Sequence, residues 1–407
     1  MSYPIRAISR DEVGEFYRQM ALGFGWDPAE GMAEGFAAFL ESERTRCAFD
    51  GDDIVGTLAT HSLELAVPGG VLATGGTTMV TVRSSHRRRG ILRQMMSSHL
   101  DEVAGRGEPL AALWASESQI YERFGFGCAS ELCRIVVERA HSEFAETPEF
   151  SGRCRLLTPE EARRQLPAVY EKLWRGRPGH FARSPLWWEA RHFSDPPWKR
   201  EGGSALRFAL YERDGEARGY LQYRQQAKSD EANLPRGRLH VVELQAEDAE
   251  ASAALWHHAL GVDLIEMVQA WNRPPDDPLF WLLADPRRAR RSQRDALWVR
   301  ILDLPAALAG RRYAVEGRVT LQVSDALRPD NSGTYVLEGG PEGAECARGG
   351  GPPDLELDVA DLGAALMGGS RLATLARAGR VRGAPEAVAR ADRFFAWDPP
   401  PWCPEIF

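Results

Sequence analysis

The chain has 407 residues, of which 43% are hydrophobic and 27% are charged, and its formal net charge is −8. This composition is that of a globular protein, and the length is sufficient for two to four hydrophobic cores. The acidic balance argues against a bulk nucleic-acid-binding protein and is compatible with a cationic substrate.

The sequence carries no signal for a membrane or for export. It has no run of about 18 apolar residues, and its start, MSYPIRAISRDEV, lacks the basic and then apolar profile of a signal peptide. The cysteines form no CxxC pair and have no histidines at metal-ligand spacing. We therefore expect a cytoplasmic protein with reduced thiols, no membrane association and no metal.

The first segment predicts strands interleaved with helices. Ser9-Arg10-Asp11-Glu12 is a capping-box pattern that predicts a helix through EFYRQMALGF. CAFDGDDIVGTLATHSLEL is typical of a hairpin turning at Asp50-Gly51, and GGTTMVTV predicts a strand ending at Val82. A helix in ILRQMMSSHLDEVAGRG, a buried strand in PLAALWAS and a short helix in SESQIYERFGFG follow. This order favours an α/β layer with some parallel pairing.

A second segment repeats the plan of the first. Thr158-Pro159-Glu160-Glu161 combines a capping box with proline at the first helical position. FALYERDGEARGYLQYR predicts a hairpin turning at Asp214-Gly215, LHVVELQA a strand, and EDAEASAALWHHALG a helix. The matching order indicates either an internal duplication or a chance recurrence of hairpins. The second segment lacks an arginine-glycine loop between strand and helix.

From about residue 293 the pattern changes to strands followed by helices, which predicts an α+β module. The run Gly349-Gly350-Gly351 has neither lysine nor Ser/Thr at the positions of a phosphate-binding loop, so we interpret it as a surface loop. The sequence thus predicts an α/β and α+β multi-domain protein with domains at 1–145, 146–292 and 293–407.

The strongest chemical signal lies between Val80 and Leu92, where a strand ends, a basic loop follows and a helix begins near Gly90. Free backbone N–H groups at a helix N-terminus, the helix dipole and nearby arginines together bind anionic oxygens. Gly90 leaves the backbone accessible to a phosphate. An isolated RRRG favours a solvated basic turn or a nucleic-acid patch, but the flanking strand and helix favour a pyrophosphate site.

RRRGIL after a strand resembles the acyl-CoA loop of GCN5-related N-acetyltransferases (GNAT), whose pattern is Arg/Gln-x-x-Gly-x-Gly/Ala. Arg87 and Gly90 match it, whereas Leu92 departs from the last small residue. IYERFGFG, VDLIEM, DDPLFWLLADPRRAR, ALWVRILDLPAAL, RRYA and the terminal phenylalanine resemble the Eis (enhanced intracellular survival) acetyltransferases over nearly the whole chain. The resemblance implies an active GNAT domain, a degenerate second one and a sterol-carrier-protein-like C-terminal domain.

The resemblance also implies acetyl-CoA as co-substrate and a set of residues that bind it: Val80, Val82, Arg87, Arg88, Gly90, Ile91 and Ser116. It makes Tyr121 the general acid that protonates the CoA thiolate. A phenol with a pKa of about 10 stays protonated at neutral pH and can perform this step. Without the resemblance, a buried tyrosine is more often a packing residue.

No side-chain arrangement in the sequence offers a general base, and the resemblance assigns this role to the α-carboxylate of Phe407. Its ordinary pKa of about 3.3 to 3.7 is low for an efficient base unless burial raises it or a water relays the proton. The tail WDPPPWCPEIF is rich in prolines and aromatics. We therefore expect it to be ordered and to return from the third domain to the first.

Phe24, Trp26 and Asp27 fall near the family's substrate-contacting stretch. The family usually has an acid directly before the terminal phenylalanine, but this chain has Ile406, with Glu405 one place earlier. In an extended segment this shift turns the carboxylate to the opposite side, so substrate preference is expected to change.

The resemblance implies aminoglycosides and similar polycationic small molecules as acceptors, and a homohexamer. Three alternatives stay open from the sequence. They are a protein or peptide lysine acetyltransferase, a lipid carrier with vestigial acetyltransferase domains, and a basic loop that reads nucleic acid. The pair Trp187-Trp188 is interpreted as core or subunit interface.

Overall fold

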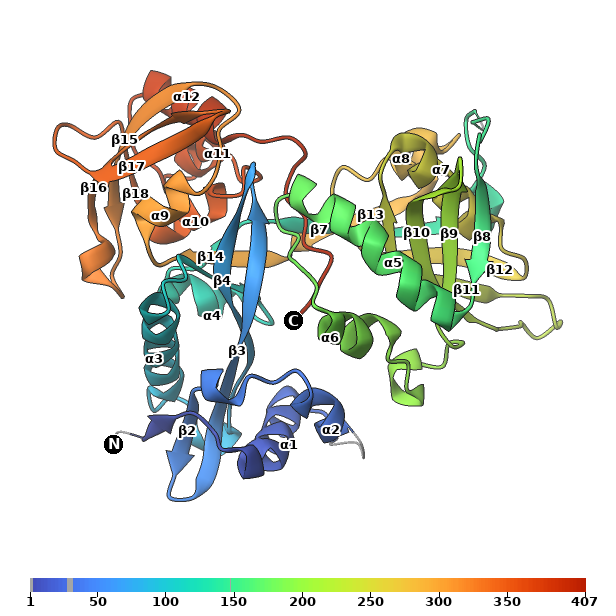
Figure 1. Cartoon of the computed structure of the whole chain (residues 1–407), viewed down its shortest axis with the longest axis horizontal. Helices are drawn as coiled ribbons and strands as arrows, with labels where there is room; N and C mark the ends of the chain where they lie inside the picture. The colour runs from blue at the N-terminus through green and yellow to red at the C-terminus, as the bar shows by residue number, and fades with distance from the viewer. Residues whose placement is uncertain (1–2, 28–31, 147) are drawn as a thin grey trace. The chain divides into compact units, whose positions relative to one another are not determined.

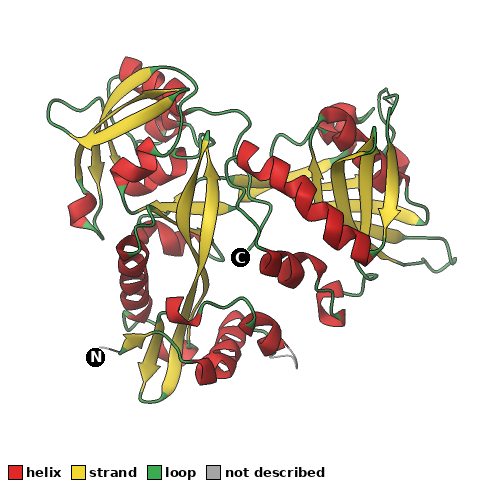
Figure 2. Ribbon diagram, viewed as in Figure 1, coloured by secondary structure: helices red, strands yellow, loops and turns green. Residues whose placement is uncertain are grey.

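The computed structural model describes residues 3–27, 32–146 and 148–407 (Figures 1 and 2). The chain forms two compact units: the first contains Met1–Ser130, Arg177–Ala182 and Asp295–Phe407, and the second contains Glu131–Gly176 and Arg183–Arg294. The architecture confirms the predicted α/β and α+β multi-domain class. Within the described residues, every helix is too short or too polar to cross a membrane.

The first unit holds two sheets. A seven-stranded sheet has the order β1 (Ile5–Arg6), β2 (Cys47–Asp50), β3 (Asp53–Val67), β4 (Gly70–Val82), β5 (Leu110–Trp114), β14 (Leu297–Ile301), β6 (Gly127–Cys128). A four-stranded sheet has the order β17 (Gly343–Arg348), β16 (Gly333–Gly340), β15 (Gly317–Ser324), β18 (Leu355–Asp358). The helices of this unit are α1 (Val13–Phe24), α2 (Met32–Ala37), α3 (Ile91–Gly105), α4 (Ser118–Tyr121), α9 (Leu304–Ala309), α10 (Val359–Ala365), α11 (Leu372–Arg377) and α12 (Pro385–Phe395).

The second unit is built on one seven-stranded sheet. Its order is β13 (Arg290–Asp295), β7 (Glu131–Glu138), β12 (Ile265–Arg273), β11 (Gly237–Ala246), β10 (Glu216–Gln226), β9 (Arg207–Arg213), β8 (Arg153–Leu157). Its helices are α5 (Pro159–Leu173), α6 (Pro185–Trp187), α7 (Ala249–Gly261) and α8 (Leu279–Leu282). Trp187 and Trp188 are both buried, as a core role predicts.

Local sequence signals place several helix starts and turns correctly. The Ser9 N–H donates to the Glu12 carboxylate at 2.8 Å, and a short 3₁₀ turn leads into α1. The Thr158 hydroxyl accepts the Glu161 N–H at 3.2 Å at the start of α5. Both Asp-Gly turns connect hairpins, β2 to β3 and β9 to β10. The Gly349–Gly351 run is an exposed loop.

Two strands near the predicted domain bounds join a different sheet from the one their position in the sequence suggests. The apolar strand β14, expected in the C-terminal module, pairs antiparallel with β5 and β6 and so completes the first sheet. The strand β7 pairs with β12 in the second unit. All five residues of β14 are buried, which an interior sheet position satisfies. The bounds 1–145, 146–292 and 293–407 stay a prediction about the division along the sequence.

The first sheet opens between two of its parallel strands. β4 pairs with β5 only from Thr74–Leu110 to Gly76–Ala112, although β4 continues to Val82. The register between β3 and β4 shifts at Leu58, where two residues of β4, Met79 and Val80, lie opposite one residue of β3. Met79 has φ 54°. We call the opening between β4 after Gly76 and the end of β5 the fork. On this side of β4, no described strand pairs with the backbone after Gly76.

The C-terminal tail is ordered and reaches the first sheet, as predicted from its composition. The Trp402 N–H donates to the Pro178 carbonyl at 2.9 Å, and Trp402 and Cys403 are buried. The Phe407 ring lies 5.7 Å, centroid to centroid, from that of Phe181. A β-carbon added to Gly76 would lie 3.3 Å from Cε2 of Phe407. The last residue therefore lies against β4 where the fork begins.

Candidate active site

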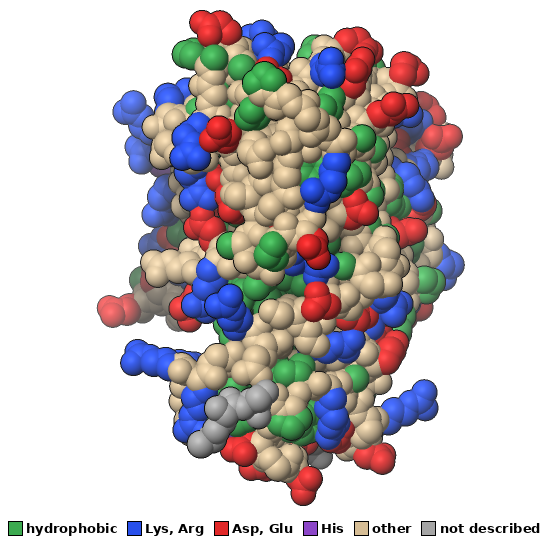
Figure 3. Space-filling model, turned by 90° about the vertical axis from the view of Figure 1, so that its left-hand side faces the viewer, with side chains coloured by type: hydrophobic (Ala, Val, Ile, Leu, Met, Phe, Trp, Pro, Cys, Tyr) green, Lys and Arg blue, Asp and Glu red, His purple; other side chains and the backbone are tan. Residues whose placement is uncertain are grey.

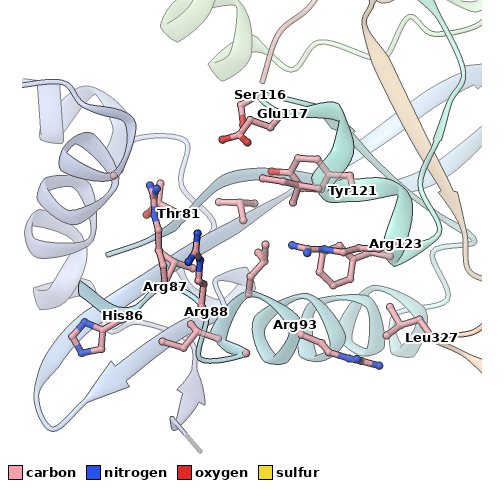
Figure 4. Close-up of a pocket in the computed structure, with 18 of the residues that line it drawn as sticks. Thr81, His86, Arg87, Arg88, Arg93, Ser116, Glu117, Tyr121, Arg123 and Leu327 are labelled. Carbon is pink, nitrogen blue, oxygen red and sulfur yellow. The ribbon is translucent and has the colours of Figure 1, made fainter. Parts of the chain in front are cut away.

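A cavity of about 810 Å³ lies between the end of β4, the start of α3, and α4 with the turn that follows it (Figure 4). Its walls bring together most of the residues predicted from the sequence: Phe24, Val80, Val82, Arg87, Arg88, Gly90, Ile91, Ser116 and Tyr121. These residues come from three separate stretches of the chain, at Phe24, from Val80 to Ile91 and from Ser116 to Tyr121. The fold thus collects them at one site beside the fork.

The loop between β4 and α3 has the conformation of an anion site. Arg88 and Gly90 both adopt left-handed backbone angles, with φ 64° and 80°, directly before α3 begins. Gly90 is required there by its backbone conformation as well as by the accessibility inferred from sequence. The Arg89 guanidinium donates to the Tyr3 hydroxyl at 2.8 Å, whereas Arg87 and Arg88 point into the cavity (Figure 4). Backbone donors, helix N-terminus and two arginines fit a diphosphate.

Tyr121 extends from α4 over the cavity and is 5% exposed. Burial raises the pKa of its phenol, the hydrogen bond with Ser116 lowers it in part, and the negative charge of Glu117 raises it further. The net shift is upward. The phenol is therefore protonated at neutral pH and is able to donate a proton.

The cavity also contains residues that the sequence interpretation missed. Arg93 lies in the first turn of α3, and Arg123 lies two residues after Tyr121 with its guanidinium 5.1 Å from the Phe124 ring centroid. Arg93 closely follows the predicted Gly90 loop and Arg123 closely follows the predicted acid Tyr121, so proximity in sequence could have indicated both arginines. Ala326 and Leu327, from the loop between β15 and β16, have no such signal because they are about 200 residues away in sequence.

The other predicted residues lie outside the cavity lining. The Trp26 ring stacks on Phe24 with centroids 5.2 Å apart, and Asp27 is exposed. Phe407 lies against Gly76 and Phe181, not among the cavity-lining residues. Glu405 is 4% exposed and Ile406 is 48% exposed. The two side chains thus differ in burial as expected from an extended segment.

The residues present fit acetyl-CoA. The unpaired edge of β4 offers backbone groups to an amide-containing arm, and the Gly90 loop offers donors and cations to a diphosphate. Within the described residues, His, Cys, Asp and Glu side chains form no group of three with the geometry to hold a metal.

Comparisons with protein families match three regions of the chain. Residues 4–129 match an acetyltransferase (GNAT) domain, and residues 179–301 match a second acetyltransferase (GNAT) domain. Residues 304–404 match a sterol carrier protein domain. The duplication left open by the order of the elements therefore corresponds to two acetyltransferase domains.

Relatives cover the full length of the chain. An uncharacterized N-acetyltransferase of Streptomyces avermitilis is 38% identical over all of both chains. The N-acetyltransferase Eis of Mycobacterium bovis is 37% identical over 86% of this chain and 85% of its own.

Solved structures agree with these relatives. Eis1 from Mycobacterium abscessus matches with a TM-score of 0.84 and 31% identity over 99% of this chain and 100% of that one. A GCN5-related N-acetyltransferase from Anabaena variabilis shares the fold, with a TM-score of 0.86, 19% identity and full coverage of both chains. The chain belongs to the Eis-like family of GCN5-related N-acetyltransferases and is an N-acetyltransferase.

Proposed function

We propose that this N-acetyltransferase acetylates amines of polycationic small molecules, aminoglycosides foremost, by direct transfer from acetyl-CoA without an acyl-enzyme. The observation that supports this proposal most is the position of the last residue. Phe407 lies against Gly76, the last residue of β4 that pairs with β5, and Tyr121 lines the cavity at the same fork. These contacts support a role for the terminal residue in the same region as Tyr121.

In this proposal the cofactor is bound in three parts. The backbone of Val80 and Val82 pairs with the pantetheine arm, and the Val82 amide points to the thioester carbonyl. Arg87, Arg88, Gly90 and Ile91 hold the diphosphate, and Ser116 contacts the CoA near its reactive end. The unpaired edge of β4 and the left-handed Gly90 support these assignments.

The chemistry needs one proton removed and one supplied. The acceptor amine attacks the thioester carbonyl carbon, so a C–N bond forms and the carbonyl becomes an oxyanion. The Phe407 carboxylate takes the amine proton, directly or through a water. When the tetrahedral intermediate collapses, the C–S bond breaks and Tyr121 protonates the departing thiolate. The upward shift in the pKa of Tyr121 supports its role as the acid.

Charge and aromatic surface support a polycationic acceptor. The net charge of −8 and the terminal carboxylate attract ammonium groups. Phe24 lines the cavity, Trp26 stacks on it, and Asp27 follows on the exposed end of the same segment. Aromatic faces beside a carboxylate suit an ammonium ion. We propose these three residues as acceptor contacts, and we propose that Ile406 in place of an acid changes which amine is preferred.

The alternatives differ in acceptor or in class. A protein or peptide lysine acetyltransferase would use the same acid and base, so a comparison of aminoglycosides with lysine peptides separates the two. A lipid carrier needs an apolar cavity in the C-terminal domain. In that domain the Tyr313 and Phe394 rings stack 4.1 Å apart and Arg311 is 1% exposed between packed elements, which favours a filled interior. Lipid that co-purifies with the chain would favour the carrier.

A nucleic-acid-binding role has less support. On the face shown in Figure 3, basic and acidic side chains are interspersed, whereas nucleic-acid binding favours a continuous basic surface. A homohexamer and a cytoplasmic location also stay predictions from the family resemblance. Analytical ultracentrifugation tests the hexamer.

Thiol release from acetyl-CoA with a panel of amines tests the proposed function. We expect aminoglycosides to support thiol release. Adding one alanine after Phe407 moves the carboxylate away and should reduce kcat at least a hundredfold, whereas Phe407→Leu retains a terminal carboxylate and should lose far less. If the extended chain turns over at the wild-type rate, the carboxylate mechanism is wrong although the acetyltransferase assignment stands.

A further inference from the structure

We propose that the loop 325–328 of the C-terminal domain forms one wall of the acyl-CoA site and receives the 3′-phosphoadenosine end of the cofactor. The inference rests on the cofactor placement in the proposed function. It gives the sterol-carrier-like domain a part in cofactor binding that is separate from the supply of the terminal carboxylate.

The first observation is the composition of the cavity wall. Ala326, which is exposed, and Leu327, which is half-buried, line the same cavity as Arg87 and Tyr121. Figure 4 shows Leu327 on the side of Arg93 and Arg123, away from His86. The loop therefore borders the end of the cavity that neither the fork nor the Gly90 loop occupies.

The chemistry of this end fits an adenine and a phosphate monoester. Arg93 and Arg123 both line it, and no described carboxylate forms an ion pair with either side chain. Arg123 lies over the Phe124 ring, and Leu327 packs against the hydrophobic core beside Phe124. Two uncompensated cations suit a phosphate dianion, and an arginine plane with apolar neighbours suits a purine face.

The loop is held in a fixed shape by Asp325, which is 3% exposed. Its Oδ1 accepts the backbone N–H groups of Leu327 at 3.2 Å and Arg328 at 3.0 Å. Its Oδ2 accepts from Nη2 of Arg300 at 2.6 Å. Arg328 also pairs with Asp101 on α3. A loop with this many fixed groups presents Ala326 and Leu327 without a large ordering cost.

Arg300 connects the loop to the turn that carries Arg123. The guanidinium is fully buried, and its Nε and Nη1 atoms have no hydrogen-bond partner among the described residues. The Arg300 guanidinium packs against Gly125, because a β-carbon added to Gly125 would lie 2.5 Å from Nη1 of Arg300. Gly125, with φ 82°, ends the turn after α4. One side chain from β14 therefore sets the positions of both walls of the proposed adenosine site.

The test changes charge at an exposed cavity residue, which leaves the core intact. Ala326→Glu places a carboxylate beside the expected 3′-phosphate, Ala326→Arg places a cation there, and Val315→Glu is the matched control at a 47% exposed position outside the cavity. Calorimetry on the full chain measures Kd for CoA and for dephospho-CoA. We expect Ala326→Glu to weaken CoA binding at least tenfold and dephospho-CoA binding no more than threefold. Ala326→Arg should bind CoA at least as tightly as wild type, and Val315→Glu should bind it equally.

Three results would overturn the inference. They are a CoA affinity of Ala326→Glu within twofold of wild type, equal losses for CoA and dephospho-CoA, and equal losses in Ala326→Glu and Ala326→Arg. If the wild-type chain itself binds neither ligand, the proposed function fails together with this inference. If wild type binds CoA and Ala326→Glu binds it equally, this inference alone fails.

Discussion

The two acetyltransferase domains share a plan but differ at the junction between the central strand and the helix that follows it. Each has a hairpin with an Asp-Gly turn, then a strand, a helix and a parallel partner strand: β4, α3 and β5 in the first, and β11, α7 and β12 in the second. In the first domain a basic loop with left-handed Arg88 and Gly90 separates strand from helix. In the second, Asp248 takes that position and caps α7 by accepting the Ala251 N–H at 2.9 Å.

The parallel strands also separate differently. In the second domain β11 and β12 pair as far as Val241 and Ala270. Beyond this pair the Arg273 guanidinium donates to the Leu244 carbonyl at 2.7 Å and to Asp277 at 2.7 Å. An arginine thus bonds to a carbonyl of β11 beyond the parallel pairing, whereas no described strand pairs with β4 on the β5 side after Gly76. The second domain therefore has an acidic cap where the first has a basic loop, and an arginine bond where the first has an unpaired strand edge.

The largest effect is expected from removing the Arg273 side chain, which bonds to β11 beyond its pairing with β12. Arg273→Leu removes the cation and donor from the Oδ2 atom of the buried Asp277 and the donor from the Leu244 carbonyl, which should cost about 3–5 kcal/mol in the free energy of unfolding of that domain. Chemical denaturation followed by hydrogen exchange in β11 and β12 measures it, and the double variant Arg273→Leu/Asp277→Leu should recover part of the loss. A loss below about 1 kcal/mol would mean that Arg273 does not hold the ends of β11 and β12 together.

The next effect separates backbone strain from cofactor binding. Gly90→Val and Gly215→Val place a β-carbon at nearly equal left-handed φ values, 80° and 78°, in the first and second domains. Both substitutions should cost similar stability, but only Gly90→Val should reduce kcat/KM, by about a thousandfold, or about 4 kcal/mol. Thiol release and thermal unfolding are the measurements. Equal losses of activity in the two variants would contradict the role of Gly90.

The acid in the first domain should give a smaller loss. Tyr121→Phe is expected to lower kcat about a hundredfold, since the thiolate must leave without a proton donor. Because burial raises the pKa of Tyr121, wild-type kcat should fall only above the ordinary tyrosine pKa of about 10, as the phenol loses its proton. Tyr121→Phe should lack that decline. Tyr211→Phe, whose hydroxyl contacts Glu250 in the second domain, is the control, and wild-type kcat in Tyr121→Phe would make Tyr121 a packing residue.

The smallest effect over the conditions compared, pH 7.5 and 5.5, concerns acid sensitivity. His99 on α3 is fully buried between the hydroxyls of Thr60 and Thr77, at 2.9 and 2.7 Å, and burial lowers its pKa to about 3. The corresponding helix of the second domain, α7, buries apolar residues such as Leu255 and Ala259. Below about pH 6.5, His99 binds a proton in the unfolded chain, whereas the buried His99 of the folded first domain does not. Stability should therefore fall with pH between about 6.5 and 3, by up to about 1.4 kcal/mol per unit.

Denaturation at pH 7.5 and 5.5 measures this dependence. His99→Gln retains the ability to hydrogen-bond the two threonines without titrating, so its stability should change less between the two pH values. An equal change in both proteins would assign the acid sensitivity to other groups.

The sequence predicted local structure and cofactor chemistry because both depend on neighbouring residues. The capping boxes at Ser9 and Thr158 and the two Asp-Gly turns are satisfied within a few residues of chain. The stretch from Val80 to Gly90 supplies Val80, Val82, Arg87, Arg88 and Gly90 to the cavity lining within a few residues of chain. The sheet that β14 joins, and the ion pair of Arg300 with Asp325, could not be predicted because their partners are distant in sequence and carry no local pattern.

By itself, the sequence determined the class of the protein, its repeated plan, the loop at Arg87 to Gly90 and the ordered tail. Only the tertiary structure decided that the strand edge beyond Gly76 is unpaired in the first domain, and that Arg273 satisfies the corresponding edge in the second. It also brought Phe407 to Gly76, and Ala326 and Leu327 to the cavity beside the fork. The physical reason is that backbone pairing and burial are settled by which segments meet in space, whereas turns, caps and helix N-termini are settled by the few residues that form them.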